Sequence, residues 1–234
     1  MIRKDARALI DQLESSPEQF YARGGSYSLL QRLFHERDLS IVIPLLESSD
    51  PHVNAVGLFC ASELGTRAYP LVDAVIPFTS SLDVKTARMA IEVLAVCSTL
   101  EHANDYWHVL KCLQSSSVEI RVLVMDLMVH SEVAQFIAAS ESRSLPSCHG
   151  TGLHLLMKEP LFEEREVLSL LHSEKRLDVR YGAVIMIRNR IRSDLLSERT
   201  RAAVNSDAVE GDDISLLLQI PRIQGCLRST SASP

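Results

Sequence analysis

The chain has 234 residues, of which 46% are hydrophobic and 23% are charged, and its formal net charge is −6 at pH 7. This length and composition predict a soluble globular protein with a sizeable core and exclude a disordered chain. The negative charge disfavours broad binding to the phosphates of nucleic acids and permits a basic protein partner. Five cysteines, an odd number spread along the chain, favour a reducing compartment over a disulfide framework.

Residues 1–36 are predicted to form one or two opening helices that cap the fold. The apolar residues of the first helix follow helical spacing: Ala6, Leu9, Ile10 and Leu13. A second helical run covers residues 27–35, after breaks at Pro17 and Gly24-Gly25. This segment has no apolar secretory core, and no apolar run in the chain approaches the ~20 residues of a membrane span. We therefore expect a cytoplasmic protein of bacterial type that does not contact a membrane.

A motif then recurs along the chain: a short apolar helix, a Ser/Asp break, and a second helix that opens on a valine. The valines after the breaks are Val53, Val84, Val118 and Val179, which are spaced by 31, 34 and 61 residues. Because the last interval equals about two repeats, we expect a degenerate unit near residues 131–160. Its two helices, over residues 131–142 and 147–158, are predicted to be separated at Pro146.

The start of the second helix is marked in several units. Asp50 and Asp83 stand where N-caps belong, and Pro51 occupies the first helical position. Towards the end of the chain, a last short helix is predicted to begin near Asp212 or Asp213. From Gln224 onward Ser, Thr and Pro are frequent, which predicts a flexible tail over residues 224–234.

The repeat spacing, the openings Asp50-Pro51-His52-Val53-Asn54 and Asp178-Val179-Arg180, and the Ala/Leu/Val pattern that follows them resemble HEAT repeats over residues 38–192. The third unit departs from the pattern, since Ser117 replaces the Asp. Armadillo repeats are the neighbouring alternative and need a third helix per unit. The resemblance implies an all-α fold, a short right-handed α-solenoid of about six helix pairs. We expect one domain over residues 1–223, with a C-terminal cap at 193–223.

In such stacks the second helices line the concave face, and their polar residues form a ladder from repeat to repeat. We predict that this ladder binds a partner. Its residues are His52, Asn54, Glu63, Lys85, Arg88, Glu92, Glu119, Arg121, Asp126, Arg180, Tyr181, Arg188 and Asn189. The ladder ends at Arg188-Asn189-Arg190-Ile191-Arg192. These cations fit the dipole of a helix C-terminus, or they bind an acidic partner surface or nucleic acid phosphates.

Candidate catalytic and metal-binding residues form no complete set. Cys148-His149 with His154 lacks the paired ligand spacing of a structural zinc site, so we expect no metal and no cofactor. The acidic run at residues 163–166 is interpreted as a solvated first helical turn. Three further cysteines lie in apolar helical runs and are interpreted as packing residues: Cys60, Cys97 and Cys112.

Asp105-Tyr106-Trp107 raises one enzymatic alternative. The HEAT-like alkylpurine DNA glycosylases are of similar size and use aromatic residues and an Asp in a concave cleft. That family is typically basic and has several tryptophans in its groove, whereas this chain is acidic and has one Trp. Trp107 is therefore interpreted as a packing residue, and the glycosylase stays the second choice.

The chain is predicted to be a non-catalytic protein-binding solenoid, because it offers an extended groove and no catalytic set. A small, acidic, free-standing HEAT-like protein resembles some bacterial immunity proteins, which bind and neutralise a cognate toxin domain. The resemblance implies a toxin domain as the partner. A scaffold or regulatory subunit of a larger assembly is a further alternative.

Overall fold

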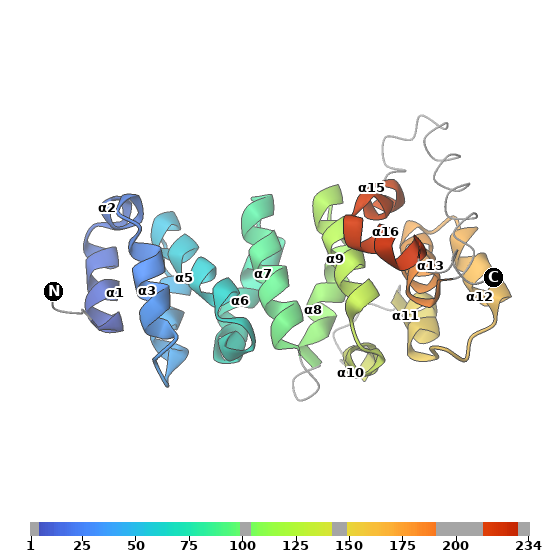
Figure 1. Ribbon diagram of the computed structural model, residues 1–234, viewed down its shortest axis with the longest axis horizontal. Helices are drawn as coiled ribbons and strands as arrows, with labels where there is room; N and C mark the ends of the chain where they lie inside the picture. The colour runs from blue at the N-terminus through green and yellow to red at the C-terminus, as the bar shows by residue number, and fades with distance from the viewer. Residues whose placement is uncertain (1–4, 99–103, 142–148, 191–212, 229–234) are drawn as a thin grey trace. The chain divides into compact units, whose positions relative to one another are not determined.

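The computed structural model describes residues 5–98, 104–141, 149–190 and 213–228, which form helices and no strand. The prediction of an all-α fold is confirmed for this part of the chain (Figure 1). The chain divides into two compact units, Met1–Thr99 and Leu100–Pro234, which we name unit 1 and unit 2. The expectation of a single repeat domain over residues 1–223 stays a prediction.

Unit 1 opens with the predicted cap helices, α1 (Ala6–Ser15), α2 (Pro17–Ala22) and α3 (Gly25–Leu33). The apolar stripe of α1 is buried as its spacing predicts. Gly24 separates α2 from α3 in a left-handed conformation, with φ of 69°, which glycine adopts without steric strain.

Two longer helices, α5 (Pro51–Glu63) and α7 (Val84–Cys97), form the rest of the frame of unit 1. α3 packs against α5, and α5 packs against α7. Shorter pieces connect them: η1 (Leu39–Val42), α4 (Ile43–Leu46), η2 (Gly65–Leu71), α6 (Val72–Val75) and η3 (Ile76–Ser80). The predicted first helices are thus broken into 3₁₀ and α turns. Prolines at 44, 70 and 77 explain this, because each removes a backbone donor.

The predicted caps are confirmed. The Asp50 carboxylate accepts a hydrogen bond from the backbone N–H of His52 at 2.8 Å. The Asp83 carboxylate accepts one from Thr86 N–H at 2.9 Å and a second from the Thr86 hydroxyl. The hydroxyl bond, and then the backbone bond, lower the Asp83 pKa. Ser117 caps α9 (Val118–His130) in the same way, because its hydroxyl accepts from the backbone N–H of Ile120. A serine there fulfils the role of the expected Asp.

Unit 2 is built around α13 (Arg176–Asn189), in which every residue from Tyr181 to Ile187 is buried. α9 (Val118–His130), α11 (Gly150–Met157) and α12 (Glu164–Leu171) all pack against α13. The remaining elements are α8 (Tyr106–Lys111), η5 (Cys112–Gln114), α10 (Val133–Glu141), α15 (Asp213–Gln219) and α16 (Pro221–Arg228).

Several boundaries in unit 2 refine the sequence expectations. α10 and α11 stand at the two helices expected in the degenerate unit, and Pro146 lies outside the described residues. α13 begins at Arg176, two residues before Asp178, which accepts a hydrogen bond from the Ser173 hydroxyl. α15 begins at Asp213, as expected. Helix α16 extends over Pro221–Arg228, residues 229–234 lie outside the described residues, and the flexible tail stays a prediction.

None of the described helices is, by itself, long and apolar enough to cross a membrane. α9 and α10 together have suitable length and composition, but the chain bends by 117° between them.

Candidate functional site

The predicted partner-binding residues of unit 1 lie on α5 and α7, two helices that pack side by side. Four of these side chains are exposed: His52, Glu63, Lys85 and Arg88. The other two, Asn54 and Glu92, are half-buried. Arg88 Nε donates to Glu92 Oε1 at 2.9 Å on the surface of α7. The structure therefore leaves a mixed-charge surface on α5 and α7, which we name the unit 1 face.

Sequence reasoning missed an aromatic residue next to this face. Tyr27 of α3 is 67% exposed, and its ring meets the edge of the Phe59 ring of α5 at a centroid distance of 5.3 Å. Tyrosine combines a large apolar ring with a polar hydroxyl and is enriched at protein interfaces. The sequence predicts that Tyr27 begins the helical run over residues 27–35, but it does not show that the side chain is exposed.

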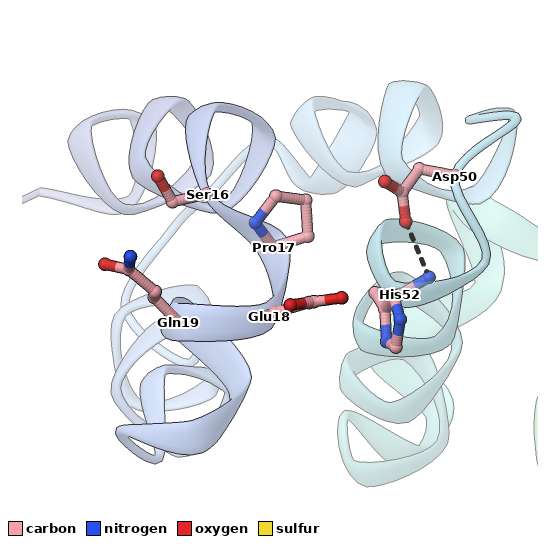
Figure 2. A pocket seen from close by; sticks show the side chains of 6 residues that line it. All are labelled: Ser16, Pro17, Glu18, Gln19, Asp50 and His52. Carbon is pink, nitrogen blue, oxygen red and sulfur yellow. Dashed lines mark hydrogen bonds between the residues drawn. The ribbon is translucent and has the colours of Figure 1, made fainter.

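A pocket of about 300 Å³ lies where α2 and α5 begin, and His52 is one of its lining residues. Figure 2 shows Glu18 extending from α2 toward α5, whereas Gln19 points away. The Asp50 carboxylate at the rim is engaged as the cap of α5. The pocket thus provides a small polar recess, lined by Ser16, Pro17, Glu18, Gln19, Asp50 and His52.

The predicted residues of unit 2 are placed differently, because most are paired inside the fold. Arg121 and Arg180 are 7% and 9% exposed, and both guanidinium groups bind the carboxylate of Asp213. Burial lowers the Arg180 pKa, while the hydrogen bond to Asp213 opposes that shift. Asp126 is 3% exposed and accepts a hydrogen bond from Arg222 of α16 at 2.8 Å. These ion pairs thus join α9 and α13 to the C-terminal helices α15 and α16.

Arg188 and Asn189 are half-buried and meet at Glu159. Arg188 Nε donates to both Glu159 oxygens, at 2.9 and 3.0 Å, and its Nη1 donates to the carbonyls of Met128, Val129 and Ser131. These carbonyls end α9. Arg188 is thus a cation at a helix C-terminus, although at the end of α9 and not of its own helix. Residues 191 and 192 of the basic run lie outside the described residues.

Tyr181 is fully buried and belongs to a short polar chain. Its hydroxyl lies 2.8 Å from His149 Nδ1, and His149 Nε2 lies 2.9 Å from the Gln114 side-chain amide. Burial lowers the pKa of His149 from 6.5 to about 4, so the ring is neutral at pH 7. A neutral imidazole has one donor and one acceptor nitrogen, which matches its two partners.

Glu119 is the one predicted residue of unit 2 that is exposed. The Ser117 hydroxyl donates to its carboxylate at 2.7 Å, which lowers the Glu119 pKa. Of the thirteen predicted residues, the six of unit 1 lie on the adjacent helices α5 and α7, and four of them are exposed. Unit 2 directs most of its seven into hydrogen bonds and ion pairs of the fold.

Two residues considered for catalysis, Cys60 and Trp107, differ in burial. Cys60 is buried, and burial raises its pKa to about 12, which disfavours the nucleophilic thiolate. Trp107 is half-buried on α8 and is covered by Lys111, whose Nζ lies 4.6 Å from the ring centroid. Within the residues that the structure describes, which exclude Cys148, no three His, Cys, Asp or Glu side chains converge as metal ligands.

Glu163 and Glu166 form a capping box at the start of α12, in agreement with the expected acidic first turn.

Comparisons of the chain with protein-family models, with curated proteins and with solved structures find no match.

Proposed function

We propose that this chain is a non-catalytic protein-binding module that binds its partner through the unit 1 face. The observation that carries the proposal is the row of exposed side chains on the adjacent helices α5 and α7, next to exposed Tyr27. Tyr and Arg are enriched at protein interfaces, and charged residues are typical of the polar rim around the interface core.

The charges of this face are expected to orient a partner more than to increase its binding affinity. Arg88 and Glu92 are 63% and 38% exposed and form an i,i+4 pair, which contributes only about 0.3–0.5 kcal/mol to stability. Their charges are thus available to a partner at little cost to the fold. The pocket beside His52 offers a recess for one partner side chain at the edge of the face.

More specifically, we propose that the fold is a right-handed HEAT-like solenoid and that the chain acts as a bacterial immunity protein. Its partner is then a toxin domain with a surface that complements mixed charges. The resemblance in repeat pattern, size and acidic charge supports this assignment. A scaffold or regulatory subunit would use the same face on a partner that is not toxic.

The test begins with affinity capture of the tagged chain from its native cells, with mass spectrometry of proteins retained at moderate salt. The captured partner is then expressed alone and together with the chain. Growth arrest by the partner, relieved by the chain, supports the immunity function. A partner that is harmless alone refutes immunity but leaves protein binding, and recovery of nucleic acid alone refutes both.

The face itself is tested with purified partner. We expect Tyr27→Ala and Arg88→Glu each to weaken binding by at least tenfold, as for residues in the centre of an interface. Arg37→Glu, an equal change of charge at an exposed residue between α3 and η1, is the matched control and should leave affinity unchanged. Equal affinity of all three variants would place the partner elsewhere.

A further inference from the structure

The last two helices of unit 2 cover polar residues that the sequence assigns to a binding surface. α15 packs against α9 and α13, and α16 packs against α13 and α15 (Figure 1). The pair meets the surface at two charged points, through Asp213 on Arg121 and Arg180 and through Arg222 on Asp126. Both acidic and basic side chains of the surface thus have an opposite charge supplied by the C-terminal pair.

The Asp213 carboxylate occupies a receptor formed by two helices. Arg121 of α9 donates to it from Nε at 3.0 and 3.1 Å and from Nη2 at 2.7 Å. Arg180 of α13 donates from Nε at 2.6 Å. Two arginines around one carboxylate leave one net positive charge. A buried site of this kind strongly favours an acidic ligand.

The two guanidinium groups are held in place without the help of Asp213. Arg121 Nη1 donates to the carbonyls of Ser115 and Ser116, each at 2.9 Å, and Arg180 Nη1 donates to the Leu113 carbonyl at 2.8 Å. These carbonyls belong to the segment that follows α8. The receptor is therefore preorganised by the body of unit 2, which lowers the cost of binding a carboxylate.

The C-terminal pair contributes few of the buried aliphatic side chains of unit 2. Its helices have seven and eight residues, below the roughly 12–15 residues that a helix needs to be stable alone. Among its described side chains, the buried aliphatic ones are Ile214, Leu217 and Ile223. The Ser215 hydroxyl is buried with no hydrogen-bond partner among the described residues, which costs stability. Elements with few buried contacts open before the rest of a fold.

We propose that the surface of α9 and α13 is a docking site for a helix of a partner protein, and that α15–α16 is its displaceable internal occupant. The partner helix carries Asp or Glu in its first turn, as Asp213 does, with aliphatic residues one and four positions later, as Ile214 and Leu217 do. Displacement exchanges one carboxylate for another between the two arginines. This proposal concerns a different surface from the unit 1 face and does not rest on the proposed function.

The test uses the full chain with a protease site introduced within residues 191–212 and cleaved after folding. A fluorescent synthetic peptide of residues 213–228 is then added, and its binding is followed by anisotropy. We expect the peptide to replace the resident fragment. The Asp213→Asn peptide should bind at least about 100-fold more weakly, because it leaves two buried arginines without a carboxylate. Since the change is made in the peptide, it cannot impair folding of the chain.

A second peptide tests whether the site accepts a foreign helix. It is an alanine-based helix of the same length that retains only the Asp, Ile and Leu of positions 213, 214 and 217. Binding within tenfold of the native peptide supports a partner helix of this chemistry. A chain that carries Glu174→Gln, a change at an exposed residue between α12 and α13, should bind both peptides as before.

Three results would overturn the proposal. The first is a resident fragment that never exchanges, which would make α15–α16 a permanent part of the core. The second is equal binding of the Asp and Asn peptides. The third is a combined result: the native peptide exchanges, the foreign helix does not bind, and the uncleaved chain forms dimers. That result would assign the site to a second copy of the chain. Because Arg88→Glu should not alter peptide binding, failure here is distinguishable from failure of the proposed function.

Discussion

Gly152 of α11 lies against the ring of Tyr181, and its replacement by alanine should destabilise unit 2. A Cβ atom at Gly152 would lie 2.3 Å from Tyr181 Cγ and 2.4 Å from Tyr181 Cβ. Carbon atoms pack at about 3.5–4.0 Å, so the ring would have to retreat by more than about 1 Å. Tyr181 is fully buried and bound to His149, which leaves it little room to move.

The expected loss is about 2–3 kcal/mol of unfolding free energy. Inserting a methyl group into a packed core costs about 1–3 kcal/mol and sometimes more, and this contact is unusually short. The higher helix propensity of alanine returns up to about 1 kcal/mol. A weakened hydrogen bond between Tyr181 and His149 adds about 1 kcal/mol to the cost.

Urea unfolding followed by circular dichroism at 222 nm measures this loss. Gly150→Ala is the matched control, because a Cβ there meets nothing within 4 Å, and it should change stability by at most about 1 kcal/mol in the favourable direction. Equal stability of the Gly152→Ala and Gly150→Ala chains would refute the packing argument.

Three further predictions concern buried polar groups. Burial lowers the folded-state pKa of His149 to about 4, so the free energy of unfolding should fall by about 3 kcal/mol as the pH drops from about 6.5 to 4. Urea unfolding of the native and His149→Gln chains across that pH range measures this effect. If the stabilities of the two chains depend on pH in the same way, the prediction is wrong. Arg188→Lys should lower the free energy of unfolding, measured with urea, by about 2 kcal/mol or more, because lysine cannot form the paired hydrogen bonds to Glu159. The control Arg165→Lys changes a side chain that is 82% exposed and should leave this free energy almost unchanged. Burial raises the pKa of Cys60 to about 12, so its thiol should resist a thiol reagent at pH 8 in the folded chain and react after unfolding. Labelling of Cys60 in the folded chain at the rate of a free thiol would contradict its burial.

Local chemistry made the helices predictable. Asp50 and Asp83 cap α5 and α7 because a short acceptor side chain before an apolar run satisfies free backbone donors, a relation that involves only neighbouring residues. The start of α15 at Asp213 also agrees with the sequence, which predicts a helix from Asp212 or Asp213. The first helices were less predictable, because prolines within them divide each into short α and 3₁₀ turns.

The candidate site was predictable only where helices are exposed. Lys85 and Arg88 lie on the outside of α7, as their position opposite the apolar stripe predicts. Arg121 and Arg180 have the same sequence character, yet they are buried. A glycine inside a helix is unfavourable by local propensity, and only the packing shows that Gly152 allows the close approach of Tyr181.

The sequence by itself determined the all-α character, the helix starts and the apolar stripes, because caps and helical periodicity act over a few residues. Only the tertiary structure decided which charged residues face solvent. Arg121 meets its carboxylate 92 positions along the chain, at Asp213, and Arg222 meets Asp126 over 96 positions. No local pattern encodes such a pairing, because it depends on where the C-terminal helices pack and on the desolvation that their packing imposes on the charges beneath them.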